Sequence, residues 1–391
     1  MNVPPAAYPV PMLKRGITMK KLIALLCAVL VLGTSARALD VSAPSALLME
    51  KETGTVLFAK DEHAKLEPAS VTKVMTILLT MEAIDSGQLS YDTVITASAH
   101  ACSMGGSQIW LKENEQMTVS DMLKAVCVVS ANDCAVALAE QIAGSEESFV
   151  ERMNQRAAEL GMNDTTFKNA TGLPAEGHVT SAYDIAIMSR ELVLNHPDIR
   201  QYTTIWMDTL RDGASSLVNT NKLIRFYEGA TGLKTGSTDN ALYCLSATAE
   251  RDGMELIAVI MKDATSAQRF EDAKTLLSYG FSTYALKQVT PEAALPPIPV
   301  KLGTQATVQP VLKENSALLL EKSQAGQLAQ SVTLASQVDA PVSKGDLLGA
   351  LTVTSGEDVI AELPLVAGED VSRVTYGQML RRVLQMAFLA G

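Results

Sequence analysis

A serine and a lysine stand three positions apart in the stretch EPASVTKVMTILLTMEAI, as Ser70 and Lys73. Residues three apart on a helix share a face, so the hydroxyl and the amine are expected to be neighbours near the start of a helix that begins around Pro68. Apolar residues cover nearly all sides of this helix, which predicts burial. Burial and nearby positive charge favour a neutral amine, which can take a proton from the hydroxyl. S-x-x-K alone is common, however, and a lysine that reaches the surface beside an inactive serine is then the simpler interpretation.

Two further short motifs carry polar groups that can act on a ligand. CVVSANDCAV places Ser130 and Asn132 at a break between two helices, where a hydroxyl and a carboxamide can project into one cleft. GLKTGST places Lys234, Thr235 and Gly236 on an expected strand, and the glycine lets the backbone of a ligand approach closely. Each motif is weak alone. The order S-x-x-K, S-x-N, K-T-G, with each motif in its expected structural context, is a strong signal.

The segments around these motifs indicate one α+β domain over residues 39–284. ALLMEKETGTVLFAK predicts a β-hairpin that turns at 52–54, and further strands are expected in GATGLKTGS, ALYCLSATAE and MELIAVIM. Strands from both ends of the domain, with helices between them, predict an antiparallel sheet that is flanked by helices and carries a helical subdomain. Helical periodicity covers 121–129, 133–142, 146–160, 182–194 and a last amphipathic helix that ends near Gly280.

The composition changes after this domain. VTPEAALPPIPV predicts a proline-rich linker at 285–299, and short β-prone runs separated by turn residues predict a small all-β domain at 300–373. An amphipathic helix is expected in the last segment, 374–391. Such a basic helix can lie in a membrane interface, and a helix docked on its own protein is the alternative. Its polar face carries Gln378, Arg381, Arg382 and Gln385, and its apolar face carries Met379, Leu380, Val383, Met386 and Ala387.

Composition and charge narrow the class of protein. The chain has 391 residues, 47% apolar and 19% charged, which is typical of a globular protein of roughly two or three domains. Its formal net charge is -11 at pH 7, and an acidic surface repels nucleic acid, so no such partner is expected. The four histidines are scattered, so the sequence supports neither a metal site nor another cofactor.

Residues 1–38 are predicted to be a signal peptide. Basic Lys20 and Lys21 precede the apolar run 22–32, and SARA offers a small-x-small cleavage site that ends at Ala38. We therefore expect the chain to be exported and to act outside the cytoplasm. A retained single-span anchor is the alternative.

Four cysteines follow the leader. An exported chain can pair cysteines in disulfides, but most of these lie in apolar stretches and none shows C-x-x-C spacing, so buried free thiols are expected. They are Cys102, Cys127, Cys134 and Cys244.

The three motifs together resemble those of the low-molecular-mass penicillin-binding proteins that act as serine-type D-alanyl-D-alanine carboxypeptidases. The similarity runs from about Ala46 to the C-terminus, and the small β domain and the terminal amphipathic helix also fit that family. The resemblance implies the fold of penicillin-binding proteins and β-lactamases. Its segments are EPASVTKVMT, MGGSQIWLKENE, SANDCAVALAE, TTFKNATGLPAEGHVTSAYD, NTNKLIRFYEGATGLKTGST and RDGMELIAVIM.

The resemblance also implies a role for each matching catalytic residue. Ser70 would attack the carbonyl carbon of the penultimate D-alanine and form an acyl-enzyme, with Lys73 as its general base. Ser130 would relay a proton to the leaving amine, while Lys234 would hold that region positive and help to keep Lys73 neutral. Asn132 would hydrogen-bond the peptide amide of the substrate.

Further residues are implied to bind the substrate. The backbone N–H groups of Ser70 and Ser237 would form the oxyanion hole. Thr235 and Arg269 would bind the terminal carboxylate, although Arg269 in SAQRFEDAK can equally be an exposed arginine on a helix. His178 in EGHVTS lies where the family has a loop near the cleft, and we interpret it as structural.

The implied partners are the peptidoglycan stem peptide that ends in D-Ala-D-Ala, β-lactam antibiotics, and the outer face of the cytoplasmic membrane through the terminal helix. Two alternatives remain open. A class A β-lactamase shares the three motifs, but it carries a glutamate between the second and third motifs, and NDTTFKNATGLP contains none. A non-catalytic sensor of β-lactams or of the wall would not need the whole set of proton-transfer residues. Additional endopeptidase activity on cross-linked stem peptides is also an open alternative.

Overall fold

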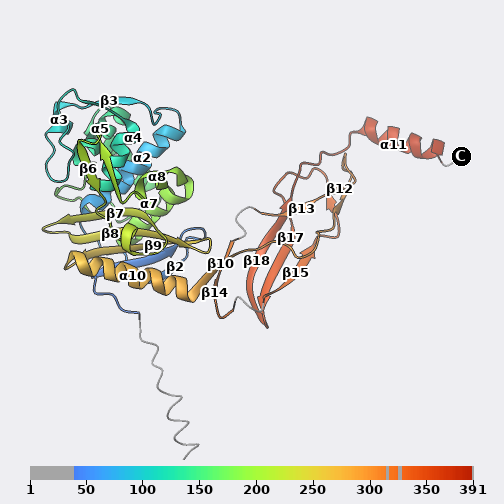
Figure 1. Cartoon of the computed structure of the whole chain (residues 1–391). Helices are drawn as coiled ribbons and strands as arrows, with labels where there is room; N and C mark the ends of the chain where they lie inside the picture. Colours follow the sequence, from blue (N-terminus) through green and yellow to red (C-terminus); the bar gives the residue numbers. More distant parts are fainter. Residues whose placement is uncertain (1–38, 314–316, 325–327, 390–391) are drawn as a thin grey trace, which may run out of the picture. The chain divides into compact units, whose positions relative to one another are not determined.

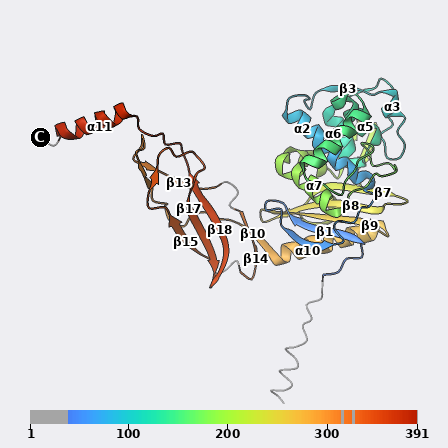
Figure 2. The same cartoon turned by 180° about the vertical axis from the view of Figure 1, so that it is seen from behind.

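Five antiparallel strands form the central sheet of the first domain (Figure 1 and Figure 2). The computed structural model describes residues 39–313, 317–324 and 328–389. The predicted hairpin at 52–54 joins the first two strands, and strands from both ends of the domain share one sheet, as expected. In the order β2-β1-β9-β8-β7, the strands are β2 Val56–Lys60, β1 Ser45–Glu50, β9 Met254–Asp263, β8 Leu242–Arg251 and β7 Ala230–Thr238.

Helices cover both faces of this sheet. The helix α10, Ser266–Thr283, packs on one face, and α7, Ala182–Asn195, packs on the other (Figure 2). Burial on both faces favours continuous rather than alternating apolar strands. Accordingly, β1 is buried at every position and β8 and β9 at most of theirs.

The helical subdomain is built around α2, Lys73–Asp85, which is buried along most of its length. A 3-10 turn, η1, Ala69–Thr72, precedes it, so Ser70 lies in η1 and not in the α-helix predicted from Pro68 onward. Ala69 has a φ of 48°, whereas an α-helix needs a φ near −60°, and this explains the later helix start.

The remaining short elements complete the first domain. Its two small antiparallel strand pairs are β3 Val94–Thr96 with β4 Gln116–Thr118, and β5 Met207–Leu210 with β6 Ser215–Val218. Its other helices are α3 Ala99–Cys102, α4 Val119–Val129, α5 Asn132–Ala143, α6 Glu146–Glu159, η2 Pro197–Ile199, α8 Arg200–Thr203 and α9 Leu223–Phe226.

Capping side chains explain where the predicted helices begin. The hydroxyl of Thr118 accepts a hydrogen bond from Asp121 N at the start of α4, and that of Ser145 accepts one from Ser148 N at the start of α6. Between α4 and α5 the chain turns at Ser130, which has a left-handed φ of 66°. The predicted helix junction at this serine is therefore confirmed.

The second domain is all-β, as expected. It contains a sheet in the order β13-β18-β17-β15, a sheet in the order β12-β11-β16, and the pair β10-β14. Its strands are β10 Tyr284–Gln288, β11 Ile298–Lys301, β12 Thr307–Val308, β13 Pro310–Leu312, β14 Ala317–Glu321, β15 Leu328–Leu334, β16 Val338–Asp339, β17 Leu347–Ser355 and β18 Asp358–Ala367.

The segment predicted as a linker, 285–299, carries strand at both ends. β10 overlaps its start and β11 overlaps its end, so only 289–297 lies outside strands. β10 pairs with β14, a partner from further along the chain, and local proline content does not reveal such a partner. The proposed domain boundaries stay a prediction.

A last helix, α11, spans Tyr376–Leu389. Gln378, Leu380, Arg381 and Gln385 are exposed on it. The attachment of this helix to a membrane stays a prediction. Among the helices of the described ranges, none is long and apolar enough to cross a membrane. The predicted signal peptide, 1–38, lies outside the described residues.

Candidate active site

The structure brings Ser70 and Lys73 together at the junction of η1 and α2. Lys73 Nζ lies 3.0 Å from Ser70 Oγ and 2.6 Å from the carbonyl oxygen of Thr171. Lys73 is completely buried, whereas Ser70 is only half-buried. A lysine that reaches the surface, which is the simpler interpretation of S-x-x-K, is therefore wrong for this chain.

Two buried amines, those of Lys73 and Lys234, interact electrostatically in this site. Burial lowers the pKa of Lys73 well below 10.5, and the charge of Lys234 lowers it further, while Asp133 acts in the opposite direction. Burial also lowers the pKa of Lys234 to about 7. The Nζ atom of Lys234 donates a hydrogen bond to Thr235 O at 2.8 Å. Burial and the charge of Lys234 therefore both favour the neutral form of Lys73.

The S-x-N motif presents two polar atoms with no partner. Ser130 and Asn132 are both 3% exposed, and in the described part of the chain neither Ser130 Oγ nor Asn132 Oδ1 has a hydrogen-bond partner. Asn132 Nδ2 donates to Gly105 O at 2.7 Å, and Asn132 N donates to Ser107 O at 2.7 Å. Buried polar atoms are nearly always paired, so unpaired ones in a cleft are candidates for ligand contacts.

The structure shows a reason for glycine at position 236, in the K-T-G motif, that the sequence did not suggest. A Cβ atom on Gly236 would lie 2.7 Å from Pro68 O and 2.9 Å from Ser70 N. The absence of a side chain therefore lets β7 lie directly against η1. Beside it, Thr235 Oγ1 donates to Thr220 Oγ1 at 2.7 Å, and Ser237 is exposed.

Arg269 is buried and contacts backbone carbonyl groups of β7 and β8. Its exposed fraction is 7%, so the alternative of an exposed helix arginine is wrong. Arg269 Nη1 donates to Gly236 O at 3.0 Å and to Cys244 O at 3.2 Å, and Nη2 donates to Ser266 Oγ at 3.4 Å. Burial lowers its pKa to about 10. These contacts attach the guanidinium to strand carbonyls, and its binding to a carboxylate stays a prediction.

The loop 169–173 lies against η1, here called the Ser70 turn because it carries Ser70. The sequence did not predict this contact. Asn169 Oδ1 accepts hydrogen bonds from Thr171 N at 3.2 Å and from Gly172 N at 2.7 Å. Gly172 has a φ of 83°, and a Cβ atom there would lie 1.9 Å from Ala69 O. The sequence signal is the run Asn-Ala-Thr-Gly, in which an Asn side chain can form a local turn.

His178 contacts the turn η1 through Thr72. Its Nδ1 atom accepts a hydrogen bond from Lys168 N at 3.3 Å, so the Nε2–H group donates to Thr72 Oγ1 at 2.9 Å. Burial lowers the pKa of His178 to about 4. These contacts fit the structural role that we expect for this histidine.

The described residues contain no cluster of three or more His, Cys, Asp or Glu side chains that could hold a metal ion. The four cysteines after the leader are free thiols. Three of them are buried, as expected from their apolar surroundings.

Two protein families match successive parts of the chain. Residues 32–265 match Peptidase_S11, described as D-alanyl-D-alanine carboxypeptidase. Residues 289–373 match the C-terminal domain of penicillin-binding protein 5.

Related proteins match most of the chain. It is 41% identical to D-alanyl-D-alanine carboxypeptidase DacF of Bacillus subtilis (strain 168), over 88% of this chain and 89% of that protein. It is 30% identical to D-alanyl-D-alanine carboxypeptidase DacC of Escherichia coli (strain K12), over 85% of this chain and 85% of that protein.

Solved structures share the fold. Penicillin-binding protein 5 from Haemophilus influenzae superposes with a TM-score of 0.75 at 27% identity, over 85% of this chain and 98% of that chain. Penicillin-binding protein D2 from Listeria monocytogenes, in its ampicillin-bound form, superposes with a TM-score of 0.57 at 33% identity, over 62% of this chain and 98% of that chain. The family match and the relatives at this level of identity agree with the geometry of the site, and this chain belongs to the D-alanyl-D-alanine carboxypeptidase family of serine peptidases.

Proposed function

We propose that this chain removes the terminal D-alanine from peptidoglycan stem peptides through an acyl-enzyme on Ser70. The observation that carries this proposal is the 3.0 Å distance between Lys73 Nζ and Ser70 Oγ, with Lys73 completely buried. A neutral amine within hydrogen-bond distance of a hydroxyl is a competent general base.

In the first step, Lys73 Nζ takes the proton of Ser70 Oγ while the oxygen attacks the carbonyl carbon of the penultimate D-alanine. The new C–O bond forms, and the C–N bond to the terminal D-alanine then breaks. Ser130 passes its hydroxyl proton to the leaving nitrogen, which departs as the amine of free D-alanine, and the Lys73 ammonium group returns a proton to Ser130, so both side chains regain their starting states. Water later attacks the ester carbonyl and releases the shortened peptide, which regenerates Ser70. The unpaired Ser130 Oγ supports this role because its hydroxyl is free for the substrate.

Backbone groups would stabilise the negative charge of the tetrahedral intermediate. We assign this role to the N–H groups of Ser70 and Ser237, a contribution of about 3 kcal/mol to transition-state stability. The close approach of Gly236 to Ser70 N supports the assignment, because it brings the two chain segments together. Asn132 would bind the acyl-side amide of the substrate.

The terminal carboxylate would lie near the K-T-G strand. Thr235 offers a hydroxyl there, and Lys234 and Arg269 place positive charge nearby. Arg269 contacts the carbonyl of Gly236, so we assign it an electrostatic contribution and leave direct contact with the carboxylate to Thr235.

β-Lactams would acylate the same serine, as supported by a relative solved in its ampicillin-bound form. The loop residue that faces Lys73 offers a backbone carbonyl, Thr171 O, and the segment 163–174 has no glutamate to activate a deacylating water. Slow release from penicillin is therefore expected, in contrast to a class A β-lactamase.

Export, cleavage after Ala38 and attachment of α11 to the outer face of the cytoplasmic membrane complete the proposal. The pattern of polar and apolar residues in 374–391 supports the membrane contact.

The direct experiment measures free D-alanine released from a peptide that ends in D-Ala-D-Ala. The wild-type chain should release it, and Ser70→Ala should not. Binding of β-lactam without release of D-alanine would instead support a sensor, and rapid turnover of β-lactam would support a lactamase.

A further inference from the structure

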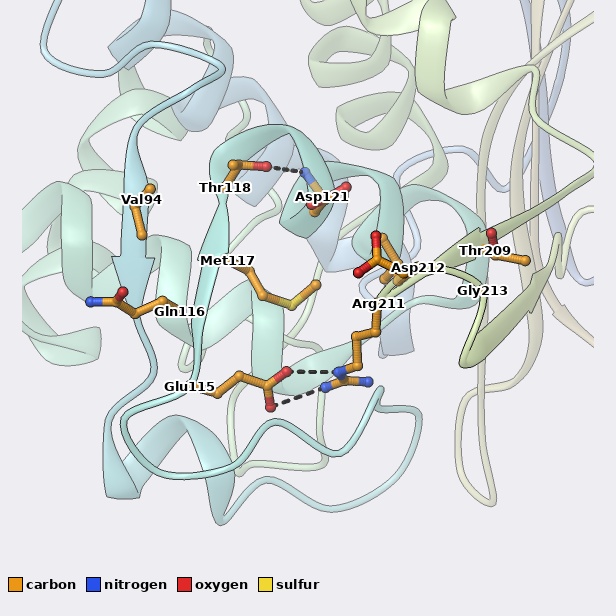
Figure 3. Close-up of a pocket in the computed structure, with 11 residues that line it drawn as sticks. Val94, Glu115, Gln116, Met117, Thr118, Asp121, Thr209, Arg211, Asp212 and Gly213 are labelled. Carbon is orange, nitrogen blue, oxygen red and sulfur yellow. Dashed lines mark hydrogen bonds and ion pairs between the residues drawn. The ribbon is translucent and has the colours of Figure 1, made fainter.

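Arg211 joins the tip of the β5–β6 hairpin to the chain segment before α4. Arg211 Nε and Nη2 donate to the two carboxylate oxygens of Glu115 at 2.7 and 3.2 Å (Figure 3). Nη1 donates to Ile109 O at 2.9 Å and to Ser215 Oγ at 2.9 Å. One guanidinium therefore fixes the outer side of the loop 105–115. We call this segment the Asn132 loop because it contacts Asn132, which lies in α5.

A buried carboxylate fixes the same loop from the inside. Asp133, the second residue of α5, is completely buried. Its oxygens accept hydrogen bonds from Ile109 N at 3.1 Å, from Leu111 N at 3.0 Å and from Cys134 N at 2.9 Å. Ile109 is thus held at both of its backbone groups, its N–H by Asp133 and its carbonyl by Arg211.

The Asn132 loop in turn sets the orientation of the Asn132 side chain. Gly105 O accepts from Asn132 Nδ2, and Ser107 O accepts from Asn132 N, both at 2.7 Å. A Cβ atom on Gly106 would lie 3.0 Å from Asn132 Nδ2, so the loop lies directly against the carboxamide. Among the described residues the carboxamide oxygen has no hydrogen-bond partner, so it is available to a ligand.

We propose that Arg211 is a positioning residue for the acyl-side subsite: by holding the Asn132 loop through Ile109 and Glu115, it keeps the Asn132 carboxamide oriented toward the substrate. The inference rests on the proposed role of Asn132. Arg211 acts through the loop and does not itself touch the substrate.

The chemistry of the contact requires an arginine. A planar guanidinium can bind both carboxylate oxygens of Glu115 and a backbone carbonyl at the same time, whereas a lysine offers a single point charge. A partly exposed ion pair adds little to global stability. The effect of Arg211 is therefore expected on the geometry of the loop more than on the unfolding of the domain.

The test is a double-mutant cycle on the full chain, with acylation by benzylpenicillin as the readout. Penicillanic acid, which lacks the acylamido side chain, serves as the second reagent. Arg211→Ala should slow acylation by benzylpenicillin about tenfold and acylation by penicillanic acid much less, because only the former offers an amide to Asn132. In the Asn132→Ala background, Arg211→Ala should have little further effect on benzylpenicillin.

Arg156→Ala is the matched control. Arg156 is a half-buried arginine like Arg211, and it pairs with the carboxylates of Glu82, Glu159 and Glu191, but it does not contact the Asn132 loop in the described structure. The Arg156→Ala variant should leave the ratio of the acylation rates with the two reagents unchanged. If Arg211→Ala does not fold, Arg211→Lys replaces it and should give a smaller change in the same direction.

The inference would be overturned if Arg211→Ala slowed acylation by both reagents equally. It would also be overturned if the effect of Arg211→Ala on acylation added fully to that of Asn132→Ala. If Asn132→Ala itself leaves acylation by benzylpenicillin unchanged, the proposed role of Asn132 fails first and the inference fails with it.

Discussion

Lys73 Nζ lies 3.0 Å from Ser70 Oγ, where the turn η1, which carries Ser70, meets the buried helix α2, which begins at Lys73. The same nitrogen lies 2.6 Å from Thr171 O. A neutral amine has two N–H groups and one lone pair, so it can donate to the carbonyl and still accept the serine proton. A charged ammonium group can only donate. The burial that makes Lys73 costly to the fold is therefore what makes it useful as a base.

Lys73→Met should abolish acylation and raise the free energy of unfolding at pH 7 by about 1 kcal/mol. The folded protein binds the Lys73 proton more weakly than the unfolded protein does, because burial lowers the pKa below 10.5. Wild-type stability therefore rises with pH between the lowered pKa and 10.5. The advantage of the variant should shrink over that range. Urea unfolding at several pH values checks this, and an unchanging gap would contradict it.

Lys234→Gln should shift the acid limb of the pH–rate profile for acylation to higher pH. Acylation needs a neutral Lys73, so its rate rises with pH through the pKa of Lys73, and the charge of Lys234 lowers that pKa. Because Lys234 itself has a pKa of about 7, the difference between variant and wild type should be largest below about pH 7. The measurement is the acylation rate constant across pH, with Lys274→Gln as the control. An unmoved limb would argue against coupling of the two amines.

Gly172→Ala should disrupt the Ser70 turn. Its Cβ atom would lie 1.9 Å from Ala69 O, whereas Gly161 has a similar φ of 75° and open space around it. Both substitutions place alanine in a left-handed conformation, at a cost of about 1 kcal/mol. Only Gly172→Ala should also slow acylation, by about a hundredfold. Equal acylation rates in the two variants would show that the 169–173 loop does not hold the nucleophile.

Removal of 376–391 should release the mature protein from membranes and leave its activity on small peptides unchanged. The reason is that a basic amphipathic helix binds anionic lipid through charge and buried apolar area. Fractionation of cells that express each form, together with D-alanine release, checks both parts. Membrane association that persists after both leader cleavage and tail removal would exclude the helix as the anchor.

Several parts of this site could be predicted from the sequence because they depend on local chemistry. The 3.6-residue period places the helices, and the polar break S-A-N marks the junction where Ser130 adopts a left-handed φ. The chain order of the three motifs indicates that they meet. The burial of Lys73 follows from its apolar neighbours.

Other parts depend on backbone atoms from distant segments and leave little trace in residue types. Any residue could supply the carbonyl that Thr171 offers to Lys73. The need for Gly236 comes from Pro68 and Ser70, far away in the chain. The burial of Arg269 depends on its packing against β7, and the pattern of α10 alone does not reveal it.

The most direct measurement is the site and stoichiometry of acylation. The full chain is incubated with benzylpenicillin, its intact mass is determined, and a digest locates the adduct. The account predicts one penicilloyl group per molecule, carried by Ser70, and no adduct on Ser70→Ala. An adduct on another residue, or one that persists in Ser70→Ala, would contradict the assignment of Ser70 as the nucleophile.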